Sequence, residues 1–138
     1  MLHRHQVQVY YEDTDLSGVV YHANYLRYFE RAREHLLGVR ELVRLLEAEG
    51  IGFVVYKCGM AFKEGAVLGD VVEIRTEATR ESDYRLCFAQ NAWRVGQRGA
   101  TGMEPKLLVE GTVELVCVDA QKSLARIPGS VLQRVSSS

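Results

Sequence analysis

Two aspartates, Asp13 and Asp15, stand two residues apart in the turn-forming segment EDTDLSG, just before a predicted helix. The first turn of a helix has backbone N–H groups without intrahelical partners, and its dipole favours negative charge. A thioester carbonyl placed there would find a donor for the oxyanion that forms during attack. A carboxylate a few residues upstream could attack that carbonyl or activate a water molecule. By itself the pattern favours an aspartate that forms the turn or caps the helix, and hydrolytic chemistry at a carbonyl group is the alternative that this placement allows.

The helix that must position this segment is expected over residues 22–37, where apolar residues recur at helical spacing. Gly38 is a natural stop for it, and a shorter helix is expected over residues 39–49. Charged residues of the first helix recur at three- and four-residue spacings, which predicts a surface network of ion pairs. They are Arg27, Glu30, Arg31, Arg33 and Glu34.

The rest of the chain predicts an antiparallel sheet. Strands are expected over residues 5–11, 53–62, 72–79, 85–95 and 106–118. Residues 96–105 predict a glycine-rich hairpin loop, residues 130–135 a short helix, and residues 136–138 a frayed tail. One long helix and a meander of strands predict an α+β domain with the helix packed on the sheet. Because such a sheet has open edges, homo-oligomers are expected.

Composition narrows the class of protein. The 138 residues suit one domain, residues 1–138, and the net charge of −1 argues against a nucleic-acid partner. Cys58, Cys87 and Cys117 lie in apolar runs, which is typical of buried, reduced thiols in a cytosolic protein. No stretch reaches the roughly 20 apolar residues of a membrane span, and the N-terminus is unlike a signal peptide. A cytoplasmic protein is expected.

The chain resembles the 4-hydroxybenzoyl-CoA thioesterase family, and most closely its YbgC-like acyl-CoA thioesterase branch. The similar segments are YYEDTD at 10–15, GVVYHANY at 18–25, FERAR at 29–33, FVV at 53–55 and VCVD at 116–119. The resemblance implies a hotdog fold, in which a five-stranded antiparallel sheet wraps around a long central helix. It also implies hydrolysis of an acyl-CoA or acyl-carrier-protein thioester without a cofactor.

The same resemblance assigns roles to single residues. It implies that Asp15 is the catalytic base or nucleophile and that His22 supplies a backbone N–H to the thioester oxygen. Val20 and Tyr21 are expected to line the same site. Family sites lie at a dimer interface, which implies a homodimer or a homotetramer. The pair Leu16-Ser17 departs from the small residues that relatives often carry, and we expect it to alter packing at the pocket mouth.

The sequence gives weaker indications of the roles of other polar residues. Asp13 is expected to shape the loop through backbone hydrogen bonds, and Asn24 is expected to have a structural role. No third or fourth oxygen ligand stands near the two aspartates, so no metal site is predicted. Charge alone makes Lys57, Lys63, Arg80 and Arg85 candidates for binding the phosphates of CoA.

Two other functions stay open from sequence. A hotdog dehydratase acting on hydroxyacyl thioesters needs a histidine base beside a carboxylate on the central helix. His22 and Glu30 could serve only crudely, and the aspartate loop would have no role. A protein that binds acyl thioesters or an acyl carrier without catalysis is the second alternative, because a fold does not prove catalysis.

Overall fold

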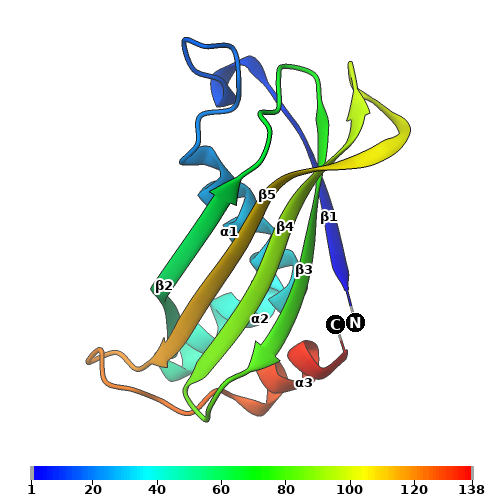
Figure 1. The fold of residues 1–138 in the computed structure, drawn as a ribbon. Coiled ribbons are helices and arrows are strands. Elements are labelled where there is room, and N and C mark those ends of the chain that lie inside the picture. Colours follow the sequence, from blue (N-terminus) through cyan, green and yellow to red (C-terminus); the bar gives the residue numbers. More distant parts are fainter. Residues whose placement is uncertain (1, 138) are drawn as a thin grey trace.

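The computed structural model describes residues 2–137, and its centre is one antiparallel sheet of five strands (Figure 1). The strands run in the spatial order β1-β3-β4-β5-β2, so β1 and β2 are the two edges. Their bounds are His3–Gln8 for β1, Gly52–Phe62 for β2, Val71–Arg80 for β3, Arg85–Gln97 for β4 and Ala100–Val118 for β5. The predicted α+β class and the five antiparallel strands are confirmed.

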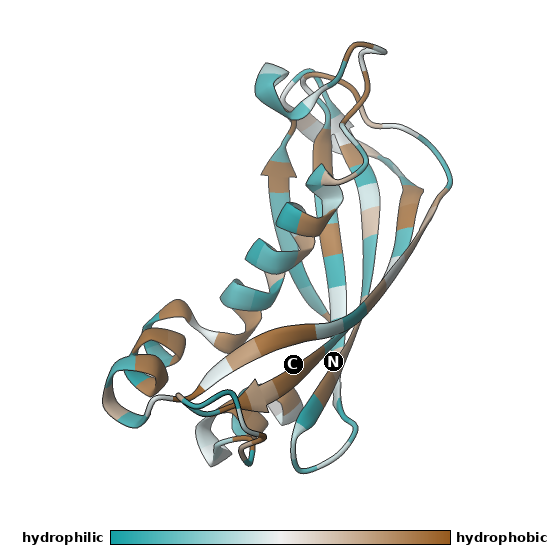
Figure 2. Ribbon diagram, turned by 90° about the vertical axis from the view of Figure 1, so that its left-hand side faces the viewer, coloured by the Kyte–Doolittle hydropathy of each residue, from teal (hydrophilic) through white to brown (hydrophobic). Residues whose placement is uncertain are grey.

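The long helix α1 (Asn24–Leu37) lies along one face of the sheet, and the strands curve around it (Figure 1, Figure 2). This arrangement is the hotdog fold. The shorter helices lie beyond the C-terminal end of α1: α2 (Val39–Arg44), the π-helical turn η2 (Leu45–Glu49) and α3 (Gly129–Ser137). The aspartate loop and the short helix η1 (Tyr11–Asp13) lie at the opposite end. No helix within residues 2–137 is long and apolar enough to span a bilayer.

Several predicted boundaries differ from the structure. The first strand ends at Gln8, because the backbone N–H of Tyr10 donates to the Asp13 carboxylate and starts the turn of η1. The predicted loop 96–105 is wrong: Arg98 and Gly99, both at positive φ, make a tight turn, and β5 begins at once. Residues 136 and 137 belong to α3, and residue 138 lies outside the described part of the chain.

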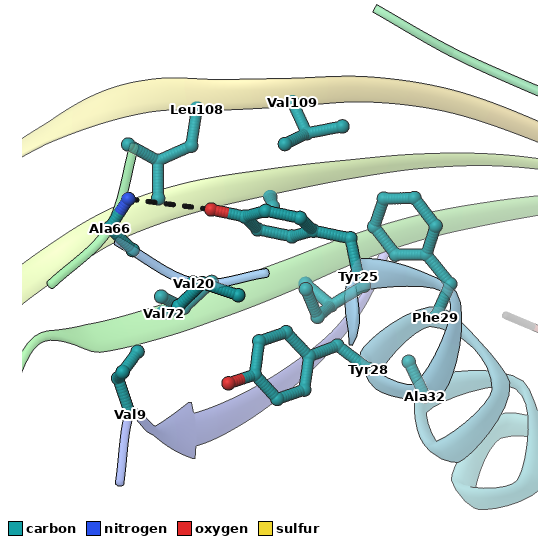
Figure 3. Packing of buried hydrophobic residues seen from close by; sticks show 12 residues of the cluster. Val9, Val20, Tyr25, Tyr28, Phe29, Ala32, Ala66, Val72, Leu108 and Val109 are labelled. Carbon is teal, nitrogen blue, oxygen red and sulfur yellow. Dashed lines mark hydrogen bonds between the residues drawn. The ribbon is translucent and has the colours of Figure 1, made fainter. Parts of the chain in front are cut away.

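The core contains two clusters of buried side chains, one under each half of α1. In the first cluster, Tyr25 and Phe29 point from α1 toward β5, and the Tyr25 hydroxyl accepts a hydrogen bond of 3.4 Å from the Ala66 N–H (Figure 3). The helix approaches β5 closely at Gly111, where a Cβ atom would lie 2.6 Å from the Phe29 ring. A glycine is therefore required at the place where helix and sheet meet most tightly.

Two predictions about polar residues are wrong. Cys58 is exposed and Cys87 is half-buried, because β2 is an edge strand and the outer face of β4 meets solvent. Only Cys117 is buried as expected, and burial raises the pKa of its thiol to about 11. The predicted ion-pair network on α1 also fails, since Arg33 turns into the core and hydrogen-bonds to Gln90.

Candidate active site

The aspartate loop is tied to the start of α1 through Asp13. One oxygen of its carboxylate accepts the Tyr10 N–H at 2.8 Å, and the other accepts the Asn24 side-chain amide at 2.9 Å. The backbone carbonyl of Asp13 accepts the N–H of Tyr21 at 2.9 Å. These three bonds confirm that Asp13 shapes the loop and that Asn24 has a structural role. They fix where the following residues stand relative to the helix.

Asp15 stands at the tip of this loop with its side chain exposed. Its backbone N–H donates to the Val19 carbonyl at 2.9 Å, and its carbonyl accepts the Gly18 N–H at 3.0 Å. Gly18 has a φ of 86°, which a residue with a Cβ adopts only under strain. The reversal at Gly18 therefore presents the Asp15 carboxylate to solvent and returns the chain toward the helix.

Ser17 holds the Asp15 carboxylate in one orientation. Oδ1 accepts both the Ser17 hydroxyl at 2.6 Å and the Ser17 backbone N–H at 2.9 Å. Both bonds keep the pKa of Asp15 below its ordinary value; the hydroxyl bond has the larger effect and the backbone bond the smaller. His22 adds a still smaller effect in the same direction. The carboxylate is therefore charged at neutral pH. The free oxygen Oδ2 is the one that can accept a proton or attack a carbonyl carbon.

Ser17 was missed as a site residue by the sequence reasoning. Leu16, its neighbour in the pair expected to alter packing, is fully exposed in the single chain. The signal that could have identified Ser17 is its spacing: an aspartate two residues before a serine is typical of a turn in which the carboxylate accepts local hydrogen bonds.

The start of α1 lies two residues later than predicted. The Asn24 N–H donates to the Tyr21 carbonyl at 2.8 Å, which makes a turn of residues 21–24 before the helix proper. Within residues 2–137, the backbone N–H groups of His22 and Ala23 donate to no acceptor. Two unused donors therefore stand at the positive end of α1, on the segment that Asp13 ties to the loop.

An open pocket of about 300 Å³ adjoins this turn. Val20, His22 and Lys63 line it together with Tyr25 and Phe62. The imidazole of His22 packs edge-on to Phe62, with ring centres 6.1 Å apart, and lies 4.7 Å from the ring of Tyr21. Three of the predicted site residues thus meet in one pocket, and Tyr21 flanks it.

The structure places Arg80 and Arg85 elsewhere. Arg80 ends β3 and pairs with Asp83. Arg85 begins β4 and lies over the Tyr56 ring at 5.5 Å. At about 3.3 Å per residue, the far end of β3 is roughly 30 Å from the end beside the aspartate loop. Within one chain, neither arginine therefore reaches Asp15.

A buried ion pair holds the segment that lines one side of the pocket. The Asp70 carboxylate accepts Arg94 Nε and the Val67 N–H, both at 2.9 Å, and Arg94 also donates to the Gly65 carbonyl. The connection 63–70 is thereby fixed, and its Ala66 carbonyl accepts the Val20 N–H at 2.9 Å. Sequence alone gave no sign that these two charges meet, since 24 positions separate them.

No group of three or more histidine, cysteine, aspartate or glutamate side chains within residues 2–137 has the geometry to hold a metal ion. The loop and the start of α1 offer the charged Asp15 carboxylate, the two free N–H donors and the His22 ring as groups that can do chemistry.

Fold and loop together define a hotdog-fold protein with a charged carboxylate beside a helix start. Residues 9–135 match the family model of the Thioesterase-like superfamily, and the chain belongs to this family. It is a thioesterase.

Two named relatives and one solved structure are similar to this chain over most of its length. The acyl-CoA thioester hydrolase YbgC of Escherichia coli is 40% identical over 133 residues, which is 95% of this chain and 93% of that protein. The acyl-CoA thioesterase YbgC of Helicobacter pylori is 50% identical over 98 residues, 71% of this chain and 72% of that protein. The crystal structure of a probable thioesterase from Bartonella henselae has a TM-score of 0.77 at 31% identity, covering 93% of this chain and 100% of the other.

Proposed function

We propose that this chain hydrolyses acyl-CoA thioesters, with Asp15 as the general base or the nucleophile. The observation that carries the proposal is the pairing of a charged, exposed carboxylate with two unused N–H donors at a helix start. The relatives named as acyl-CoA thioesterases support the choice of substrate.

In the general-base route, Asp15 takes a proton from water, and the hydroxide adds to the thioester carbonyl carbon. The oxyanion accepts hydrogen bonds from the His22 and Ala23 N–H groups. Collapse breaks the C–S bond, and the proton on Asp15 passes to the departing CoA thiolate. In the nucleophile route, Asp15 attacks the carbon itself, CoA thiolate leaves, and water then hydrolyses the mixed anhydride. Both routes need the ionised carboxylate and no cofactor.

The pocket beside His22 receives the thioester. Val20 and Tyr25 form its buried wall, while Tyr21 and Phe62 offer exposed rings at its mouth. Lys63 is the one predicted CoA-binding cation that lines this pocket within the described chain, and it is exposed and free to meet a phosphate of CoA.

The enzyme works as a homodimer, or as a tetramer built from such dimers, joined through β2. This strand is an open edge, and its exposed apolar residues include Val54, Val55, Tyr56 and Phe62. Antiparallel pairing of β2 with a second copy, about an axis near Lys57, sets residues 52–55 of one chain opposite residues 59–62 of the other. The far end of one sheet then adjoins the active-site end of the second, where Arg80 and Arg85 become candidates for the CoA phosphates.

The test is Asp15→Asn, which keeps the size of the side chain and removes its charge. We expect kcat for butyryl-CoA to fall by roughly 10²- to 10⁴-fold with the fold intact, measured as release of free CoA thiol. Glu12→Gln is the matched control, because Glu12 is an exposed carboxylate of the same loop, and it should keep its activity. A fully active Asp15→Asn variant would overturn the assignment.

Further measurements separate the remaining options. A single turnover in ¹⁸O-water identifies Asp15 as the nucleophile if the label enters its carboxylate, which requires water to attack the aspartyl carbon of the mixed anhydride. Label in the acid product alone fits either the base route or attack on the acyl carbon of the anhydride, and trapping of an acyl-enzyme distinguishes these two. A 3-hydroxyacyl-CoA assayed for both thiol release and loss of water separates hydrolysis from dehydration. Tight acyl-CoA binding without turnover would favour a binding protein over an enzyme.

A further inference from the structure

A second, larger cavity lies between α1, η2 and the first residues of β2, at the end of the molecule away from Asp15. Its volume is about 520 Å³. Most of its lining is apolar and comes from Leu37, Leu42, Leu46, Ile51, Phe53 and Val54. Its charged lining residues are Glu30, Arg33, Glu34, Asp119 and Lys122. Such a lining suits a hydrocarbon chain. The His22 pocket shares no residue with it.

One buried cation lines this apolar cavity. Arg33 is only 7% exposed, and its Nη1 donates to Gln90 Oε1 at 2.9 Å. The Gln90 amide is itself fixed, because its nitrogen donates to the Phe29 carbonyl and to the Thr76 hydroxyl, each at 3.0 Å. The sheet thus holds Gln90 with its oxygen toward the helix, and Gln90 in turn orients the guanidinium of Arg33.

This guanidinium has no anionic partner among residues 2–137. A guanidinium carries five N–H donors, and Gln90 accepts a single bond from it. Burial lowers the pKa of Arg33, while Glu30 and Glu34 act on it in the opposite direction from exposed positions without forming an ion pair. An unpaired buried charge is costly, and within the described chain Arg33 is the one charged lining residue of this cavity that is buried, so its retention points to a ligand that supplies an anion.

The dimer of the proposed function connects this cavity to the reaction. Pairing through β2 sets residues 52–55, which line the cavity, opposite residues 59–62 of the second copy, which end at its His22 pocket. A thioester held at Asp15 of one chain therefore has the Arg33 cavity of the other chain beside it. An acyl group that extends away from CoA would enter that cavity.

We propose that Arg33 binds a carboxylate at the far end of the acyl group, so that the preferred substrates are CoA thioesters of dicarboxylic acids. The inference rests on the proposed thioesterase function. A planar carboxylate matches the fork of a guanidinium and forms charge-assisted hydrogen bonds with it. Glu30 and Glu34 also line the cavity, but they oppose an anion only weakly because their carboxylates are exposed and screened by water and salt. The carboxylate of Asp119, the third acidic lining residue, accepts the N–H groups of Gln121 and Ser123.

The experiment compares acyl-CoAs of equal carbon number: succinyl with butyryl, glutaryl with pentanoyl, and adipyl with hexanoyl. We expect the wild-type enzyme to favour the dicarboxylic member of at least one pair in kcat/KM. In Arg33→Gln, the ratio within that pair should fall by roughly 10- to 100-fold, which is the usual worth of a hydrogen bond to a charged group. Thermal unfolding and gel filtration establish that the variant is folded and dimeric.

Arg31→Gln is the matched control, because Arg31 is an exposed arginine of the same helix and does not line the cavity. Its ratios should equal those of the wild type. Turnover of butyryl-CoA without any preference for a dicarboxylic acyl group overturns this inference alone, as does a preference that Arg33→Gln leaves intact. Dissociation of the Arg33→Gln dimer with unchanged ratios would instead assign Arg33 an ion pair across the subunits. Failure to hydrolyse any of the six substrates overturns the proposed function itself.

Discussion

At the scale of single residues, the reactivity proposed for Asp15 depends on how its two oxygens differ. Oδ1 is held by two donors from Ser17, and Oδ2 accepts no hydrogen bond from the described residues. The bonds to Ser17 stabilise the charged form and fix the rotation of the carboxylate, so the free oxygen keeps a constant direction. An exposed aspartate on a loop thereby gains the fixed orientation that catalysis needs.

This arrangement predicts the pH dependence of the reaction. Because Ser17 lowers the pKa of Asp15, and because only the ionised carboxylate is active, kcat/KM should decline on acidification only below the ordinary range of an aspartate. Ser17→Ala removes the hydroxyl bond, which raises the pKa toward its ordinary value and moves the acid limb of kcat/KM to higher pH. The pH–rate profile with butyryl-CoA measures the shift, and Ser17→Thr should restore the wild-type limb. An acid limb that stays in place in Ser17→Ala would show that another group titrates.

Sequence predicted some of these residues and could not predict others. Asp13, Asp15 and His22 are close in the chain, so turn chemistry and helix-end physics were enough to place them together. Arg33 was assigned to a surface network because its spacing from Glu30 and Glu34 is helical. Nothing in that spacing shows that the residue faces Gln90, 57 positions away.

At the scale of elements, the connection 63–70 determines the position of the start of α1. Its Ala66 carbonyl accepts the Val20 N–H, and its Ala66 N–H donates to the Tyr25 hydroxyl. The buried Asp70–Arg94 pair fixes the connection against β4. A rigid connection therefore supports both the strand-like residues before His22 and the first turn of α1.

Arg94→Met should lower the free energy of unfolding by about 3–5 kcal/mol, because it leaves the Asp70 carboxylate buried without its cation. The double variant Asp70→Asn with Arg94→Met should lose less than the two single variants combined, since neither charge then remains unpaired. Urea unfolding of the four proteins gives the coupling energy. Strictly additive losses would contradict the idea that the pair acts as one clamp.

Sequence predicted the elements themselves better than their ends. The spacing of apolar residues and the positions of turn-forming residues predicted α1 and all five strands, because a two-layer fold imposes a clear apolar pattern on each of them. Gly102 and Pro105 follow the tight turn at Arg98 and Gly99, and their presence made the predicted loop too long. Strand β5 contains both residues near its start, close to the hairpin. The start of α1 was displaced because a hydrogen-bonded turn at residues 21–24 has the same composition as a first helical turn.

At the scale of the whole molecule, the proposed site takes residues from two chains. The aspartate loop lies at one end of the sheet, and the larger cavity lies at the other (Figure 1). Open strand edges were predicted from the element order, but sequence could not tell that β2 rather than β1 carries the exposed apolar side chains. For the same reason it could not tell which end of the sheet Arg80 and Arg85 occupy.

Pairing through β2 makes a prediction at this scale. Cys58 is exposed near the middle of β2, so Cys58→Asp should place two carboxylates close to each other across the proposed twofold axis. We expect the monomer fraction to rise as the protein is diluted, and kcat per chain to fall with it, because each site needs both subunits. Sedimentation velocity and thiol-release assays over the same range of concentration measure the two together. Ala89→Asp, which adds the same charge to an exposed position of β4, should keep the dimer and its activity. A Cys58→Asp protein that becomes monomeric yet hydrolyses acyl-CoA at the wild-type rate would show that one chain holds a complete site, and the shared-site geometry would then be wrong.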